Sequence, residues 1–174
     1  MIFWPDFWLT ELSHDHHRHG AAHPAHSFTI ERTLKASPKR VFAAWSMLEA
    51  KRKWFHGGEG WIEIKRSFDF REGGSEEAIG RKKSGVTSAF LARYWEIIPD
   101  QRIVYAYDMH LDGVRISVSL ATIELRPAGT GTHLTVTEQG AYLVTYDPQG
   151  DDHGSRERGT IELIDRIVKL VDGN

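Results

Sequence analysis

The sequence predicts an α+β fold in which a curved, seven-stranded antiparallel sheet wraps around a long C-terminal helix, with two short helices between the first and second strands. Three observations lead to this prediction. Most of residues 27–143 shows the alternation of apolar and polar residues typical of β strands, in segments separated by short turns. A helical pattern interrupts these strands once, and an amphipathic helix ends the chain. Strands joined by short turns pair as an antiparallel meander, and the last helix can cover their apolar face.

The composition excludes several classes of protein. The chain has 174 residues, 40% hydrophobic and 26% charged, as in soluble globular proteins. A net charge of -2 gives no support for a nucleic-acid partner. The absence of cysteine excludes disulfides and thiolate chemistry and fits the cytoplasm, where we expect the protein to act. No apolar run approaches the roughly 20 residues of a membrane span, and no secretory signal is recognisable.

Residues 1–26 are expected to form a flexible extension outside a single domain at residues 27–174. The extension begins with MIFWPDFWLTEL, and six of the ten histidines of the chain follow within HDHHRHGAAHPAH. A polar tail is the simplest interpretation, with a weak metal site as the alternative. The aromatic start is either an anchor for a partner or sequence upstream of the true start codon.

The first strand is expected at residues 27–34, where β-forming residues alternate. Helix 38–47 follows. Ser37 is its expected N-cap, and Pro38 stands at the first helical position, where its missing N–H costs nothing. A second short helix is expected at residues 48–55.

The remaining strands are separated by turn signals. Asp112-Gly113 is the strongest of these and predicts a tight hairpin. The next turn is expected at residues 126–129, which contain Pro127. The strands predicted in this way cover residues 61–70, 75–83, 86–98, 102–110, 114–125 and 133–143.

The final helix is predicted from about Gly154 to Val171. Its inner, mostly apolar face is expected to carry Thr160, Leu163, Ile164, Ile167 and Val171. Its other face is expected to carry mostly Arg156, Glu162, Asp165, Arg166 and Lys169.

Strand alternation indicates which side chains face this helix, and they differ greatly in size. Aromatic residues occupy one part of that face, while Ser117, Ser119 and Ala121 occupy another, opposite the small Thr160. A close-packed core leaves few voids, so small residues opposite a small residue predict a cavity; the alternative is a core filled by long side chains. The candidate ligand-binding residues are Trp45, Phe68, Phe70, Phe90, Tyr94, Tyr105, Tyr107, Ser117, Ser119, Ala121, Val136, Glu138, Thr160, Leu163, Ile164 and Ile167.

Glu138 places a carboxylate on the inner face of a strand. A buried carboxylate needs a partner. In one interpretation Arg156 or Arg158, near the start of the helix, supplies a charge-assisted bond, and the helix N-terminus favours the negative charge. In the other, Glu138 contacts a ligand or acts as a base with a pKa raised by burial.

The order of elements and several motifs resemble the START-like, or SRPBCC, superfamily with its helix-grip fold. The closest likeness is to the polyketide-cyclase-like branch named after the heat-shock-protein-90 ATPase activator. The motifs are FTIERTLKASPKRVFAAW, the pair Trp54-Phe55, DFREGG, IIPDQRIVYAYDM, DGVRISVSLATIEL, GTHLTVTEQG and RERGTIELIDRI. The resemblance implies a deep hydrophobic cavity between the last helix and the sheet. Many relatives have a bulky aromatic residue where this chain has Thr160, a difference that should enlarge the cavity.

These observations predict binding of a small, largely hydrophobic molecule, such as a lipid, in that cavity. Two alternatives stay open: a cyclase or hydrolase on the same scaffold, and a chaperone-regulating or other interaction module linked to the stress response. No catalytic residue carries over from the family, and we expect no metal, no cofactor and no membrane span. A homodimer is compatible with the sequence, but no specific residue supports it.

Overall fold

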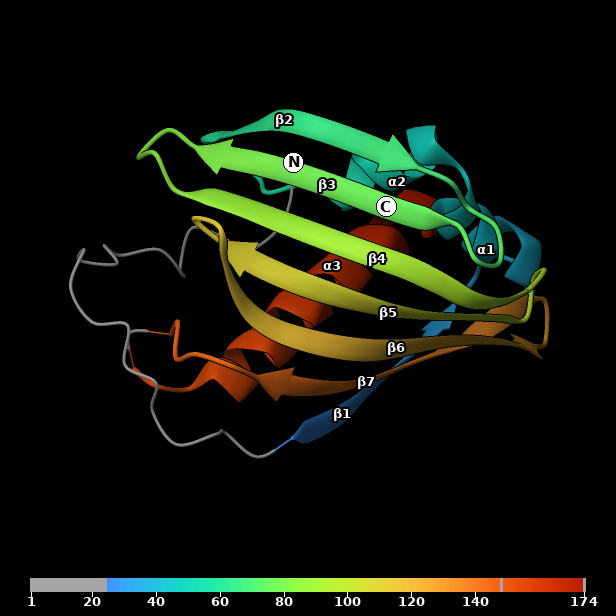
Figure 1. Ribbon diagram of the computed structural model, residues 1–174. Coiled ribbons are helices and arrows are strands. Elements are labelled where there is room, and N and C mark those ends of the chain that lie inside the picture. Colours follow the sequence, from blue (N-terminus) through green and yellow to red (C-terminus); the bar gives the residue numbers. More distant parts are fainter. Residues whose placement is uncertain (1–24, 148, 174) are drawn as a thin grey trace.

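The structure, a computed structural model, describes residues 25–147 and 149–173, so the predictions for residues 1–24 lie outside it. Seven strands form one antiparallel sheet in the order β1-β7-β6-β5-β4-β3-β2 (Figure 1). The elements are β1 (His26–Leu34), α1 (Pro38–Ser46), α2 (Leu48–Trp54), β2 (Trp61–Phe68), β3 (Ser75–Lys82), β4 (Thr87–Ile98), β5 (Arg102–Leu111), β6 (Val114–Ala128), β7 (Gly131–Tyr142) and α3 (Asp152–Asp172).

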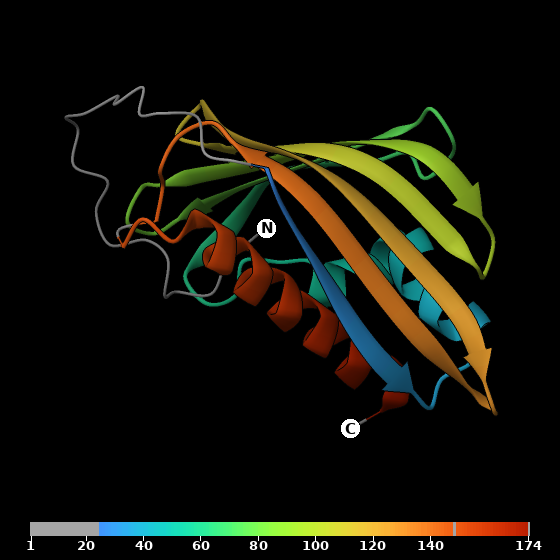
Figure 2. The same ribbon diagram turned by 90° about the horizontal axis from the view of Figure 1, so that it is seen from below.

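The sheet curves around α3, which crosses its concave side, and α1 and α2 close one end of the same side (Figure 2). This arrangement confirms the predicted α+β helix-grip fold with two short helices between β1 and β2. Within the described residues, no helix is both long and apolar enough to cross a membrane.

Carboxylates fix the start of α3, which begins two residues before its predicted position. The Asp151 side chain caps the helix by accepting a hydrogen bond from the Gly154 amide at 3.1 Å. The Asp152 carboxylate accepts from the amides of Tyr146 and Asp147 at 2.9 and 2.7 Å. The segment after β7 is thereby tied to the first turn of α3.

The far end of α3 is tied to the end of β1. The two carboxylate oxygens of Asp172 accept hydrogen bonds from the amides of Lys35 and Ala36 at 3.1 and 3.0 Å. About two turns earlier, Asp165 forms an ion pair with Arg32. Because both ends of α3 are fixed, the position of its inner face relative to the sheet is well defined.

The predicted end of β6 before residue 126 is wrong, because the strand continues through Pro127 to Ala128. Strand β5 begins at Arg102, opposite Glu124, so the part of β6 beyond Glu124 pairs only with β7, where Pro127 lies opposite Thr132. A proline is tolerated at such an edge since its missing N–H leaves no ladder bond unmade on the open side.

The core lies between α3 and the concave face, as the alternation predicts. Ile103, Ile123, Leu125, Leu134 and Val136 are all buried on the inner face of the central strands. On α3, Ile164, Ile167 and Val171 are buried against them.

Replacing Ile167 by Ala is expected to lower the free energy of unfolding by about 2–5 kcal/mol, because its side chain is 0% exposed and its removal leaves a cavity. Urea denaturation measures this change. Ile62→Ala is the matched control, since Ile62 is 53% exposed and its truncation should change stability by less than about 0.5 kcal/mol. Equal losses in the two variants would contradict the assignment of the core.

Candidate functional site

A small cavity of about 50 Å³ lies where α2, α3 and the concave sheet meet. Nine of the predicted ligand-binding residues line it: Trp45, Phe90, Tyr105, Tyr107, Val136, Glu138, Thr160, Leu163 and Ile164. Six further residues line it that the sequence did not single out for this role: Lys51, Trp54, Phe55, Met109, Ile123 and Arg156. We call this space the hollow.

The other predicted residues lie outside the lining of the hollow: Phe68, Phe70, Tyr94, Ser117, Ser119, Ala121 and Ile167. Phe68, Phe70 and Tyr94 pack on one another, with Phe70 and Tyr94 ring centroids 4.9 Å apart. Ala121 lies directly opposite Glu138 in the sheet, and Ser117 bonds to Arg156. These small residues therefore leave room for long polar side chains.

The hollow is much smaller than the deep cavity that the resemblance implies. A pocket for a drug-sized ligand measures about 300–1,000 Å³. Here the indole rings of Trp45 and Trp54, 5.5 Å apart, fill the end beside α1, and Arg156 reaches in from α3. The alternative of a core filled by long side chains therefore holds for part of the predicted cavity.

Arg156, Tyr107 and Glu138 form a buried polar group that we call, together with Thr160, the Glu138 cluster. The Tyr107 hydroxyl donates to Glu138 at 2.6 Å and accepts from Arg156 at 3.1 Å. Arg156 also donates to the Ser117 hydroxyl at 2.5 Å, and its Nε lies 3.9 Å from Glu138. Thr160 donates to the Arg156 carbonyl at 3.1 Å and lies 3.4 Å from Glu138.

This geometry identifies Arg156 as the cation that accompanies Glu138, whereas Arg158 pairs with Asp151 at 3.0 Å. The assignment of Arg156 to the outer face of the helix is wrong, because its side chain is buried. The sequence held the signal: Arg156 precedes Thr160 by four residues and Ile164 by eight, so it belongs to the inner stripe.

Burial raises the pKa of Glu138; Arg156 and the Tyr107 hydroxyl act in the opposite direction without cancelling this effect. The guanidinium of Arg156 keeps its proton in any case. Glu138 is thus a carboxyl group that can hold a proton in the pH range in which an exposed glutamate has lost it, and it faces the hollow.

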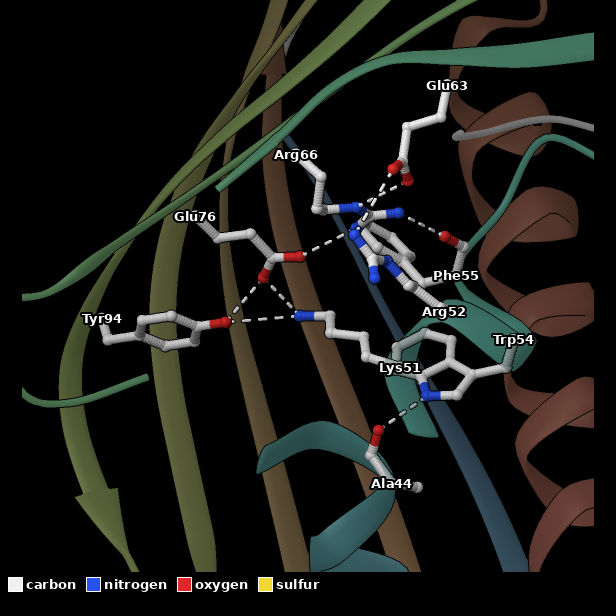
Figure 3. Close-up of polar contacts among 9 residues, drawn as sticks. All are labelled: Ala44, Lys51, Arg52, Trp54, Phe55, Glu63, Arg66, Glu76 and Tyr94. Carbon is white, nitrogen blue, oxygen red and sulfur yellow. Dashed lines mark hydrogen bonds and ion pairs between the residues drawn. The ribbon is translucent and has the colours of Figure 1, made fainter. Parts of the chain in front are cut away.

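A second buried group, which we call the Lys51 cluster, consists of Lys51, Arg66, Glu76 and Tyr94 (Figure 3). Glu76 forms a close ion pair with Lys51 and accepts from the Tyr94 hydroxyl at 2.6 Å. Its other oxygen accepts from Arg66 at 3.3 Å, and Arg66 also donates to the Phe55 carbonyl at 2.9 Å. Helix α2 supplies Lys51, while neighbouring strands β2, β3 and β4 supply the other three residues.

Lys51 is the member of this cluster that also lines the hollow. Its ammonium nitrogen lies 5.0 Å from the ring centroid of Phe55 and 5.3 Å from that of Phe68. Burial lowers the pKa of Lys51, and the ion pair with Glu76 opposes this shift. Sequence reasoning missed Lys51 and Glu76 because each lies in a segment that reads as polar and solvent-exposed.

Together the two clusters give the hollow aromatic walls and a few fixed polar groups. Such a site can hold the apolar body of a small molecule and fix its polar atoms. Among residues 25–147 and 149–173, no group of three or more histidine or acidic side chains is placed to hold a metal ion.

Arg156→Met is expected to destabilise the protein by about 3–5 kcal/mol, because it leaves Glu138 buried without its cation. The double variant Arg156→Met/Glu138→Gln should lose less than the sum of the two single losses, as measured by urea denaturation. Arg158→Met, on the exposed pair, is the control and should cost about 1 kcal/mol or less. Strict additivity in the double variant would show that the buried pair is not coupled.

The stability of Glu138→Gln relative to the wild type is expected to rise as the pH rises above 4.5, the ordinary pKa of this carboxyl. The folded state holds the Glu138 proton more tightly than the unfolded chain. The free energy of unfolding of the wild type therefore falls as the pH rises from 4.5 to the pKa of Glu138 in the folded state. The slope is at most about 1.4 kcal/mol per pH unit. Unfolding free energies at a series of pH values measure it; a relative stability of the variant that falls with pH would contradict the raised pKa.

Comparison with known proteins agrees with the fold and the motifs. A protein from Rhizobium loti of known crystal structure is 39% identical, with a TM-score of 0.75 over 84% of this chain and 97% of that one. A protein from Rhizobium leguminosarum is 38% identical, with a TM-score of 0.80 over 88% and 98%. A protein from Chromobacterium violaceum is 26% identical, with a TM-score of 0.65 over 86% and 99%. Among curated proteins, none matches the chain.

The family model described as "Activator of Hsp90 ATPase homolog 1-like protein" matches residues 35–172, from the end of β1 to the last turn of α3. The match confirms the predicted START-like superfamily. The chain belongs to the family of activator of Hsp90 ATPase homolog 1-like proteins.

Proposed function

We propose that the protein binds a small, largely apolar molecule in the hollow, and that it does so in the cytoplasm. The observation that carries the proposal is the coincidence of a small space with aromatic walls and two buried ionisable clusters. Packing at native density would close such a space unless polar groups held it open.

The size of the hollow sets the size of the ligand. A volume of about 50 Å³ suits a molecule of a few heavy atoms, not a sterol or a long-chain lipid. Phe90, Tyr105 and Leu163 are the apolar contacts for its body. Tyr107 and Glu138 offer a hydroxyl and a carboxyl group at one end.

The proposal places ligand binding in one domain at residues 27–174, with residues 1–26 as an extension. The start of β1 at His26 and the start of the family match at residue 35 support this division.

Thr160→Phe is expected to reduce binding at least ten-fold, because the larger side chain occupies the hollow. Binding is measured by native mass spectrometry and by NMR titration with a mixture of short-chain acids, alcohols, amides and small aromatic compounds. Glu162→Phe is the matched control, since Glu162 is exposed on the same helix. Absence of any bound compound in the wild type, or equal binding by both variants, would refute the proposed site.

A further inference from the structure

The two clusters that face the hollow differ in charge balance. In the Glu138 cluster, one carboxylate faces one guanidinium. In the Lys51 cluster, two buried cations, Lys51 and Arg66, share the single buried carboxylate of Glu76. Glu63 also pairs with Arg66 at 3.3 Å, but its side chain is 28% exposed and it reaches Arg52 at 3.6 Å as well. Among the buried side chains of the Lys51 cluster, cations therefore outnumber carboxylates.

The hydrogen-bonding capacity of the Lys51 cluster is unevenly used. Glu76 accepts hydrogen bonds at both oxygens, and each of the three guanidinium nitrogens of Arg66 donates one (Figure 3). The ammonium of Lys51 has three N–H groups, and its described hydrogen bonds, to Glu76 and Tyr94, use two. The donor that is left belongs to the member of the cluster that lines the hollow.

The surface groove beside the Lys51 cluster is lined by two guanidinium groups and one carboxylate. Arg52, His56, Glu63 and Arg66 line a surface groove there, and Arg66 connects it to the buried Glu76. A cleft lined mainly by one sign of charge raises the local concentration of counter-ions and speeds their arrival. The groove thus favours anions over cations near this end of the hollow.

We propose that the hollow is selective for a small organic acid, whose carboxylate receives a hydrogen bond from the Lys51 ammonium and whose short apolar body lies toward Phe90. This inference rests on the proposed binding function. The acid supplies the anion that the cluster lacks, and a carboxylate accepts strong charge-assisted bonds from an ammonium group. The Glu138 cluster, at the other side of Phe90, has no such excess and faces the body or far end of the ligand.

The test compares molecules of the same chain length and different charge. Butyrate, butyramide and butylamine are titrated into the full-length protein at pH 7, with affinity measured by NMR chemical-shift changes. We expect butyrate to bind at least ten-fold more tightly than butyramide, and butylamine to bind most weakly. Lys51→Met should reduce the advantage of butyrate over butyramide to less than two-fold.

Lys53→Met is the matched control, because Lys53 is exposed on the same helix and its loss should leave the preference for butyrate unchanged. Equal binding of butyrate and butyramide would overturn the inference and leave the proposed function standing. A preference for butyrate that survives Lys51→Met would also overturn it. Failure of all three compounds to bind would overturn the proposed function together with the inference.

Lys51→Met leaves Glu76 paired with Arg66 and Tyr94, which favours folding. If the variant does not fold, the wild type still decides the question through nuclear Overhauser effects. Contacts from the butyrate methylene next to the carboxylate to the Phe55 ring would support the inference, since this ring lies beside the Lys51 ammonium. Contacts from that methylene to Tyr107 alone would overturn it, because they would place the carboxylate at the Glu138 cluster.

Discussion

The burial of Arg156 under the concave sheet determines how α3 and the sheet meet. A guanidinium loses its water on burial at a cost of several kcal/mol, and only well-placed acceptors offset it. Tyr107, Ser117 and Glu138, from three neighbouring strands, are those acceptors. Because each lies on the inner face at a fixed register, the first turns of α3 have one position in which all of them are reached. The hollow beyond this turn follows from that spacing.

The two buried clusters are connected through aromatic rings. Phe55 packs on Phe90 with ring centroids 4.9 Å apart, and Phe90 packs on Tyr107 at the same distance. Lys51 lies beside the first ring and Glu138 bonds to the last. In the protein interior, charges interact more strongly than at the surface. A change of charge at one end of the hollow is therefore expected to alter the preferred charge state at the other.

The sequence predicted the fold better than the site, for a physical reason. Strand alternation and turn residues act locally, so the antiparallel meander and its inner face could be inferred, and Glu138 was recognised because it breaks an apolar alternation. The Lys51 cluster joins α2 to three strands and breaks no pattern: Glu76 stands beside Glu77, and Lys51 lies within a run of basic residues. Pro127 was wrongly predicted to end its strand. The proline is tolerated because β5 does not extend beside it, and the extent of a neighbouring strand cannot be inferred from the local sequence.

The small residues of β6 explain the partial error in placing the cavity. The concave face of the sheet was predicted correctly, but these small residues do not line the hollow. Ser117 and Ala121 leave space over the sheet, and the sequence alone assigns that space to a ligand. In the structure Arg156 and Glu138 occupy part of it, and the remaining void, which these two side chains also line, extends to Phe55 and Phe90. A guest in that void is nearer to the ammonium of Lys51 than the alternation of β6 suggests. The charge that selects the guest is then supplied by α2 and β2, outside the strands that first indicated a cavity.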